Sequence, residues 1–263
     1  MPTLIVSMPT LSDSGQAAVY LRKVFERVRG EVEALAGPIA DDALRDSIRL
    51  YDEHRAMMRR LYAARRAQPG CLTGAQVGAV VTSSFLMGKA EHLALLTALV
   101  EALEGGEASA EETKPKVFVV GSVCQDSGFI AAIEAAGCIV VDDDLCMGAR
   151  SFTFSDSGDA DPLDALVNIY MTRPACPAFH RPGFDPGKHI LEQVKQAGAD
   201  GVVFLLTKFC DPWGFEFVPM NHALEEAGVP TVTLEVEQNL PVPAQLRTRT
   251  EAFVELLQAR CEA

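Results

Sequence analysis

Three cysteines are the residues of this sequence whose type and position best suit chemistry. Each follows a short apolar run: Cys124 in GSVCQD, Cys146 in DDDLCMGAR and Cys210 in TKFCDP. A thiol in such a position is a small packing side chain, a nucleophile or a metal ligand, and position alone leaves these alternatives open.

The full set of cysteines restricts which kind of site is possible. The 263-residue chain has seven widely scattered cysteines, and its N-terminus lacks the pattern of a secretory signal. An odd and scattered set argues against a disulfide framework. The chain has no CxxC pair, which disfavours a zinc ribbon or a bacterial-ferredoxin cluster. Any metal site would therefore combine cysteines that are distant in the sequence.

Three consecutive aspartates just before Cys146 form a second candidate for chemistry. Asp142, Asp143 and Asp144 supply carboxylates of the kind that bind divalent cations. Such a run is more often a solvated loop that leads into a helix. We expect the solvated arrangement for these side chains.

Strands that alternate with helices are expected to position these residues. Beyond residue 115, β-rich runs predict strands at 117–120, 138–141, 202–206 and 231–234. Helices are predicted at 129–136, 162–170, 186–197, 220–227 and 245–259. The alternation predicts a parallel sheet covered on both faces, in a Rossmann- or flavodoxin-like α/β fold.

The first part of the chain is predicted to be mainly helical. Leu21 to Leu35 form an apolar stripe at helical spacing, and Thr73 with Gln76 has the pattern of a capping box. A short strand is expected at Leu4 to Val6. The polar stretch GGEASAEETKP is expected to be a loop and the boundary between two parts. We therefore divide the chain into a mainly helical region, 1–115, and a Rossmann-like α/β domain, 116–263.

A parallel sheet would gather the three cysteines at one edge. Ligands of open α/β sheets bind at the carboxyl ends of the strands, which is where Cys124, Cys146 and Cys210 are predicted to lie. Cys210 would occupy the junction between a strand and a turn that begins at Asp211. Cys138, inside a predicted strand, is expected to be a small core side chain.

Composition excludes some classes of function. A formal net charge of −13 argues against a general nucleic-acid binder, which needs basic surface to neutralise phosphates. The apolar runs are far shorter than the roughly 20 residues that span a bilayer. We expect a cytoplasmic protein that is bound neither to nucleic acid nor to a membrane.

Several blocks of the sequence together resemble one enzyme family. The chain contains, in order, GSVCQD, VVDDDLCMGARSF, DGVVFLLTKFCDPWGFEFV, ALEEAGVPTVTLEVEQ and QLRTRTEAFVELL. These blocks are similar to the C-terminal half of subunits of the 2-hydroxyacyl-CoA dehydratase and benzoyl-CoA reductase family. The stretch DDALRDSIRLYDEHRAMMRRLYAARR resembles the helical region that precedes that half. The resemblance covers essentially the whole chain.

The resemblance implies an oxygen-sensitive enzyme of two homologous subunits with a [4Fe-4S] cluster at an acyl-CoA site. It implies a partner that delivers one electron at low potential: an ATP-dependent activator protein in the dehydratases, or an ATP-dependent module in the reductases. The thioester would become a ketyl radical, after which hydroxide leaves or an aromatic ring is reduced. Cys210 matches the family's C-terminal cluster ligand. Cys146 matches a family cysteine without an assigned role, and Cys124 is a further cofactor-binding candidate from its position.

The chain departs from the family pattern in length. Family subunits carry a preceding α/β domain that supplies further cysteine ligands, and we expect that domain to be missing here. A cluster held by this chain alone would then be incomplete. Four interpretations stay open: a dehydratase subunit, a reductase subunit, a double-cubane type of redox protein, and a cluster-free module that binds a partner or an acyl-CoA.

Overall fold

The computed structural model shows an α/β protein. The residues that it describes are 3–11, 15–106, 114–122, 127–154, 158, 161–179, 181–237 and 242–261. They form two compact units, one of residues 1–56 with 153–184 and the other of residues 57–152 with 185–263. Helix α2 (Asp41–Ala67) contributes residues to both units. The proposed division of the chain at residue 115 stays a prediction.

The first unit is helical. It contains α1 (Gly15–Ala36), the first part of α2 and α6 (Pro162–Thr172), and α1 packs against α6. Leu21 of α1 and Val167 and Tyr170 of α6 form its buried cluster. Arg22 of α1 pairs with Asp161, which also caps the N-terminus of α6.

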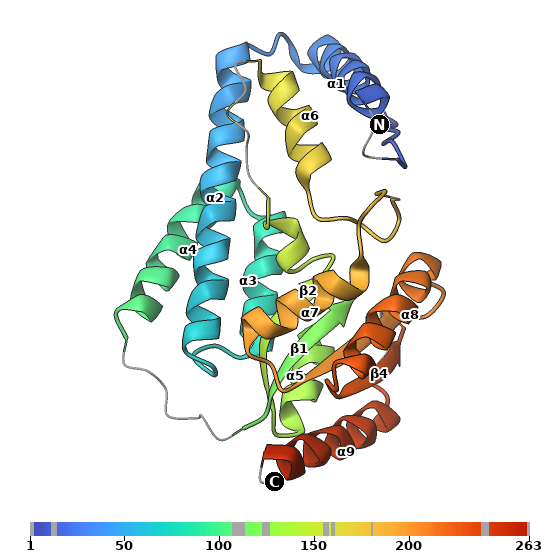
Figure 1. The fold of residues 1–263 in the computed structure, drawn as a ribbon. Helices are drawn as coiled ribbons and strands as arrows, with labels where there is room; N and C mark the ends of the chain where they lie inside the picture. Colours follow the sequence, from blue (N-terminus) through green and yellow to red (C-terminus); the bar gives the residue numbers. More distant parts are fainter. Residues whose placement is uncertain are drawn as a thin grey trace. The chain divides into compact units, whose positions relative to one another are not determined.

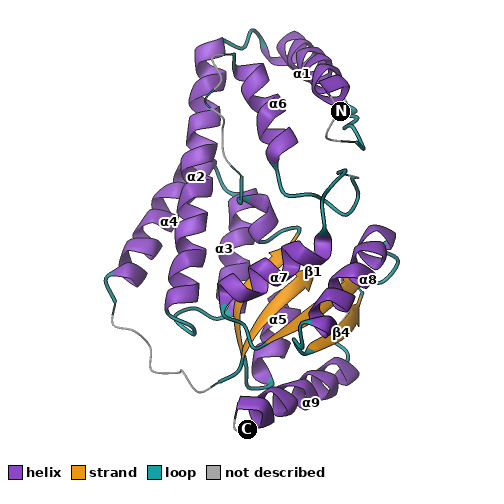
Figure 2. Ribbon diagram, viewed as in Figure 1, coloured by secondary structure: helices purple, strands orange, loops and turns teal. Residues whose placement is uncertain are grey.

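The second unit is built on a four-stranded parallel sheet (Figures 1 and 2). The strands lie in the order β2-β1-β3-β4, which is the beginning of the flavodoxin-like order. Their bounds are β1 (Lys116–Gly121), β2 (Ile139–Leu145), β3 (Gly201–Thr207) and β4 (Thr231–Val236). This arrangement confirms the predicted fold class.

Helices cover both faces of the sheet, and each face has its own hydrophobic cluster. On one face lie α5 (Ser127–Ala135) and α9 (Ala244–Cys261). On the other face lie α7 (Pro186–Ala197) and α8 (Asp211–Glu226). The central strand β3 is buried on both faces for this reason, and its sequence is an almost continuous apolar run.

The remaining helices of this unit pack beside the sheet. Met58 to Tyr62 of α2 share a third hydrophobic cluster with α3 (Gly74–Leu86) and α4 (Lys89–Glu104). Thr73 forms the predicted capping box with Gln76 at the start of α3. The carboxylate of Glu134 in α5 also accepts a hydrogen bond from the Gly74 N–H, at 2.8 Å.

A β-bulge in β2 decides which side chains reach which face. Val117 pairs with Val140 but Phe118 pairs with Asp142, so Val141 is an extra residue in β2. One extra residue reverses the alternation of side chains beyond it. Leu145 therefore joins Val140 on the α5 and α9 face, whereas Cys146 packs with Val141 on the α7 and α8 face.

Three predicted elements differ from the structure. Strand β2 extends through the three aspartates to Leu145, four residues beyond its predicted end. Helix α8 begins at Asp211 rather than at Met220, because Pro212 fits the first helical turn, where a missing N–H does not matter. Leu4 to Val6 are irregular, and the Ile5 carbonyl accepts a hydrogen bond from Arg27 instead of a strand partner.

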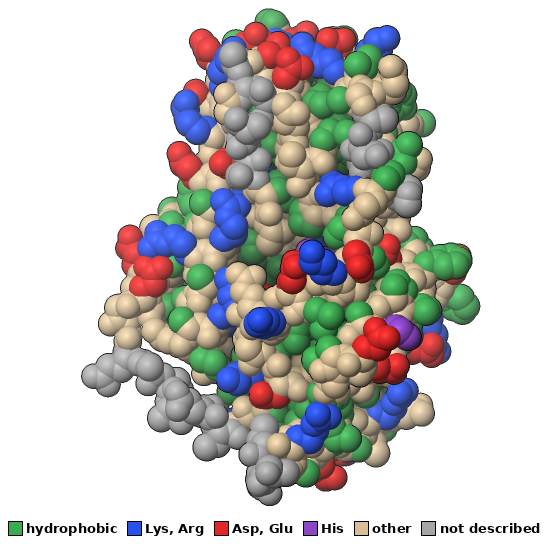
Figure 3. Space-filling model, viewed as in Figure 1, with side chains coloured by type: hydrophobic (Ala, Val, Ile, Leu, Met, Phe, Trp, Pro, Cys, Tyr) green, Lys and Arg blue, Asp and Glu red, His purple; other side chains and the backbone are tan. Residues whose placement is uncertain are grey.

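Figure 3 shows the distribution of charge on one face of the described residues. On the face drawn in Figure 3, acidic and basic side chains of the described residues are interspersed among apolar ones. Within the described ranges, none of the helices is both long enough and apolar enough to cross a membrane.

Candidate functional site

The topological switch point of the sheet lies between β1 and β3. Helix α5 follows β1 on one face and α8 follows β3 on the other, so the chain leaves the two neighbouring strands in opposite directions. Ligands of open α/β sheets bind at this kind of switch point. A Cβ on Gly121 would lie 2.0 Å from the Leu205 carbonyl oxygen, so only glycine allows this close approach. Ser122 and Thr207 join the strand ends by a 2.6 Å hydrogen bond between their hydroxyl groups.

Cys210 lies at this edge of the sheet, between the end of β3 and the first turn of α8. It is the N-cap residue of α8: its N–H donates to the Thr207 carbonyl at 3.2 Å, and its carbonyl accepts from the Gly214 N–H at 3.0 Å. The sequence predicted a strand-to-turn junction here, and the structure corrects it to a strand-to-helix junction. The N–H groups at a helix start favour negative charge, such as that of a metal-bound sulfur, beside them.

The half-buried Cys210 is one of the residues that line an open pocket of about 650 Å³ at the ends of β3 and β4. Such a volume lies within the range of small-ligand sites. Phe209 and Phe215 form apolar walls, and Lys208 and Glu235 contribute charge. Phe209 is 96% exposed and has a φ of 64°, a left-handed conformation that a bulky residue rarely adopts. An exposed aromatic residue under backbone strain is typical of a binding surface.

Cys146 lies at the same edge, directly after β2. It is half-buried, and its Sγ accepts a hydrogen bond from the Trp213 indole Nε1 at 3.4 Å. Cys146 and Cys210 pack against the same hydrophobic cluster, on the α7 and α8 face. The predicted placement of these two cysteines at one sheet edge is therefore confirmed, whereas their role as ligands stays a prediction. Cys124 lies outside the described residues.

Cys138 and Cys71 have ordinary environments for free thiols. Cys138 lies immediately before β2, buried on the α5 and α9 face, and its Sγ donates to the Ile133 carbonyl at 3.3 Å. Burial raises the pKa of the Cys138 thiol to about 12. A core role was predicted for it and is confirmed. Cys71 is half-buried in the turn before α3, where burial also raises its pKa.

The three aspartates are not in a solvated loop, as was predicted, but are buried within β2. Each has an arginine partner: Asp142 with Arg66 at 2.6 Å, Asp143 with Arg65 at 3.4 Å, and Asp144 with Arg150 at 2.6 and 2.7 Å. Buried carboxylates persist only when they are paired in this way. Two of the arginines come from α2, about 76 residues earlier, so the local sequence carried no sign of the pairing.

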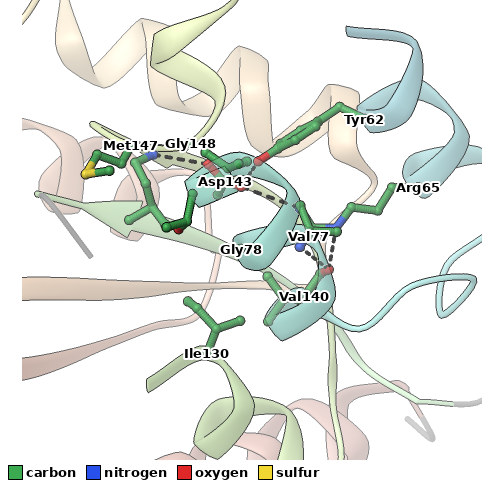
Figure 4. A pocket seen from close by; sticks show the side chains of 13 residues that line it. Tyr62, Arg65, Val77, Gly78, Ile130, Val140, Asp143, Met147 and Gly148 are labelled. Carbon is green, nitrogen blue, oxygen red and sulfur yellow. Dashed lines mark hydrogen bonds and ion pairs between the residues drawn. The ribbon is translucent and has the colours of Figure 1, made fainter. Parts of the chain in front are cut away.

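Figure 4 shows Asp143 with Tyr62 and Arg65 directed at its carboxylate. Its carboxylate accepts a 2.6 Å bond from the Tyr62 hydroxyl and a 2.9 Å bond from the Ala149 N–H. Burial and the neighbouring Asp143 charge raise the pKa of Tyr62 well above its usual value. A carboxylate held in this way serves the structure, and the cation site considered for this run has no support here.

The described residues alone do not form a metal centre. Over the ranges given above, no three side chains of His, Cys, Asp or Glu lie together as a metal ion requires. Cys210 is the cysteine among the residues that line the open pocket at the ends of β3 and β4. A four-cysteine set for an iron–sulfur cluster therefore does not fit the described part of the chain, although a single contributed ligand does.

Sequence reasoning missed Arg150 and Trp213, which frame the two cysteines. The Arg150 guanidinium lies over the Trp213 ring, 4.9 Å from its centroid, and Trp213 in turn contacts Cys146. The only signal was local: Trp213 follows Cys210 by three residues, and Arg150 follows Cys146 by four.

Comparison with known proteins gives three informative relatives, each named as a subunit of a larger enzyme. The chain is 28% identical over 239 residues to the (R)-phenyllactyl-CoA dehydratase beta subunit of Clostridium sporogenes, which covers 90% of this chain and 63% of that subunit. It is 27% identical to the lactoyl-CoA dehydratase subunit beta of Anaerotignum propionicum, over 97% of this chain and 69% of that one. It is 28% identical to a benzoyl-CoA reductase subunit of Thauera aromatica, over 91% of this chain and 63% of that subunit.

The chain thus spans about two thirds of the length of these relatives. A family model described as 2-hydroxyglutaryl-CoA dehydratase, D-component, matches residues 1–257, which is nearly the whole chain. The family resemblance predicted from the sequence blocks is confirmed by this match. The chain belongs to the 2-hydroxyglutaryl-CoA dehydratase D-component family.

Proposed function

We propose that this chain is a subunit of a 2-hydroxyacyl-CoA dehydratase-type enzyme and that Cys210 supplies one thiolate ligand to a [4Fe-4S] cluster. The family match over residues 1–257, together with the position of Cys210 in the lining of an open pocket, carries the proposal. The other ligands would come from protein outside the described residues. The enzyme would further need a homologous second subunit and an ATP-dependent activator protein.

When bound, the cluster would supply the single electron that turns the acyl-CoA thioester into a ketyl radical, from which hydroxide leaves. The chain's own residues would form part of the surroundings of the cluster. The start of α8 stabilises negative charge on a metal-bound Cys210 sulfur. Phe209 and Phe215 line the pocket and give it apolar surface for an acyl group. Lys208 is held at the rim by a 2.6 Å ion pair with Glu237.

Anaerobic iron analysis tests the ligand role. The chain is co-expressed with its homologous subunit, purified without oxygen, and assayed for iron and acid-labile sulfide. Cys210→Ser is expected to lose most of the iron, because iron–sulfur clusters are held by cysteine thiolates and a serine hydroxyl is a much poorer ligand. Cys71→Ser is the matched control, since Cys71 is also half-buried but lies before α3. Full iron content in a folded Cys210→Ser protein would reject the ligand role.

A reductase subunit is the second candidate, and one observation favours it. The identity to the benzoyl-CoA reductase subunit equals that to the phenyllactyl-CoA dehydratase subunit, at 28%. The two activities differ in product. The assembled enzyme with its electron donor and ATP is given a 2-hydroxyacyl-CoA or benzoyl-CoA, and mass spectrometry distinguishes loss of water from gain of two hydrogens.

A cluster-free module that binds a partner or an acyl-CoA is the third candidate. It is favoured by the fact that no three metal-binding side chains gather within the described ranges. Anaerobic reconstitution of this chain alone with iron and sulfide decides the matter. Stoichiometric iron and sulfide on the isolated chain would exclude the cluster-free module. Iron that appears only with the second subunit would support a shared site.

A further inference from the structure

We propose that Asp144, Arg150 and Trp213 form a chain of contacts, called the tie below, that fixes the position of Cys210. The tie starts on β2, which is separated from β3 by β1. The tie joins the carboxyl end of β2 to the first turn of α8. The three residues are positioning residues, because they act on Cys210 through the backbone of α8. The inference rests on the proposed function for the use of Cys210, but the tie itself is testable without iron.

The β2 end of the tie is a buried, two-point ion pair. Arg150 lies on the 3₁₀ turn η1 (Ala149–Ser151) directly after β2. Its Nε and Nη2 donate to the two carboxylate oxygens of Asp144 at 2.7 and 2.6 Å. Asp144 is 1% exposed. Two parallel hydrogen bonds fix the orientation of the guanidinium plane as well as its position.

The α8 end of the tie is Trp213, which is 2% exposed. The Arg150 guanidinium lies 4.9 Å from the centre of the indole ring, within cation–π distance. The indole Nε1 donates to Cys146 Sγ at 3.4 Å. The ring is therefore held at its face by Arg150 and at its edge by Cys146, and both of these residues follow β2.

Trp213 transmits this restraint to Cys210 because both belong to one helical turn. Cys210 is the N-cap of α8, Trp213 is the third residue after it, and the Gly214 N–H closes the turn on the Cys210 carbonyl at 3.0 Å. A shift of the indole moves this turn and with it the thiol. On the pocket side of the turn, Phe209 and Phe215 are exposed and offer little restraint.

The bulge at Val141 makes the tie possible. Without the extra residue, Asp144 and Cys146 would point to the α5 and α9 face, away from Trp213. The pair of Arg66 with Asp142 is a natural comparison: it joins the same residue types on the same strand at 2.6 Å, but it connects β2 to α2. Arg66→Met therefore serves as the matched control for Arg150→Met.

The experiment measures the alkylation rate of Cys210 by iodoacetamide in the full chain without iron. Mass spectrometry follows the peptide of Cys210, with the peptide of Cys71 as an internal standard for global unfolding. Arg150→Met is expected to raise the Cys210 rate about fivefold through local opening of the turn, with the Cys71 rate unchanged. Arg66→Met is expected to leave both rates at the wild-type value. Arg150→Lys is expected to give an intermediate rate, because lysine keeps the charge but not the two-point contact.

A second readout reports on the tie directly. Trp213 is the only tryptophan of the chain, so the protein's indole emission comes from this ring alone. Arg150→Met is expected to shift the emission to longer wavelength as water reaches the ring, and Arg66→Met is not. A merely structural role for Arg150 would lower global stability without this selective change at Trp213 and Cys210.

The outcomes separate the two proposals. A folded Arg150→Met protein with wild-type emission and wild-type Cys210 alkylation overturns the tie. If Arg150→Met does not fold, the Cys210 alkylation rate is measured in Trp213→Phe, which leaves no buried charge unpaired. A raised rate would support the tie, and a wild-type rate would overturn it. Iron retained in Cys210→Ser of the assembled enzyme would overturn the ligand role and leave the tie intact.

Discussion

The carboxyl ends of β2 and β3 belong to one edge of one sheet and are built in opposite ways. At the end of β2, three acidic side chains are buried and each is paired with an arginine. At the end of β3, Phe209 is exposed in a left-handed conformation and Cys210 borders an open pocket.

This difference between the ends of β2 and β3 indicates that they have different roles. Buried charges tolerate no loss of a partner, so the β2 end resists change and holds its neighbours in place. Backbone strain and exposed aromatic surface reduce stability and persist where a ligand or partner uses them. We infer that the β2 end supports the site and that the β3 end carries it. Substitutions on the two sides test this assignment.

The largest expected effect is at the β2 end. Arg65 donates to the Val140 carbonyl at 2.6 and 3.0 Å and pairs with Asp143. Arg65→Met leaves these acceptors buried without their donor and is expected to lower the free energy of unfolding by about 3–5 kcal/mol. Urea unfolding measures it. Lys188→Met, in an exposed pair at 4.0 Å, is the control and should change stability by no more than about 0.5 kcal/mol. A loss at Arg65 as small as at Lys188 would remove the distinction.

The second prediction concerns pH. Burial, and then the Asp143 charge, raise the pKa of Asp142 from 3.8 to about 6, while Arg66 opposes the rise. A raised pKa means that the folded state binds the proton more tightly, so this contribution to stability is full below pH 4 and is lost as pH rises through about 6. Relative to Asp142→Asn, the wild type is expected to lose up to about 3 kcal/mol between pH 4 and 7. Taking the difference between the two proteins cancels other titrating groups, and a difference that is flat with pH would contradict the pKa assignment.

The third prediction compares the same substitution at both ends. A Cβ on Gly148 would lie 1.9 Å from the Asp143 Oδ1, whereas a Cβ on Gly214 in α8 meets nothing within 4 Å. Gly148→Ala is expected to lower stability by about 1–3 kcal/mol through overpacking. Gly214→Ala is expected to raise it by about 0.5–1 kcal/mol through helix propensity. Thermal unfolding of the two variants side by side checks the contrast, and equal signs would refute it.

The smallest expected effect is at Phe209. Replacing it with glycine relieves about 1–2 kcal/mol of left-handed strain and adds about 0.5–1 kcal/mol of unfolded-state entropy. Phe209→Gly is therefore expected to stabilise the isolated chain by about 0.5–1 kcal/mol. If Phe209 serves ligand or partner binding, the same variant weakens assembly with the second subunit, as measured by calorimetry. Destabilisation of the isolated chain would place Phe209 among the structural residues instead.

Much of the fold follows from local patterns. The capping box at Thr73, helix α7 between its N-cap Asp185 and Gly198, and the apolar run of β3 were all readable from neighbouring residues. Parallel topology then placed Cys146 and Cys210 at one edge. These features were predictable because each rests on interactions within a few residues, or on a general rule for α/β sheets.

Most of the errors came from interactions that are distant in the sequence. Asp142 to Asp144 look solvated until Arg65 and Arg66 of α2 pair with them. The Trp213 contact with Cys146 joins residues 67 positions apart. The start of α8 was missed for a local reason: Pro212 and Gly214 resemble helix breakers, although the first turn tolerates proline.

The extra residue in β2 has a consequence for reading the family's sequences. Because Val141 is an extra residue, every side chain after it in β2 points to the opposite face of the sheet from the one that regular alternation would give. In a relative that lacks the residue equivalent to Val141, the same residue types in the rest of this strand would lie on the opposite face of the sheet. For the rest of β2, residues in the same alignment column face the same side of the sheet only when both chains contain the extra residue.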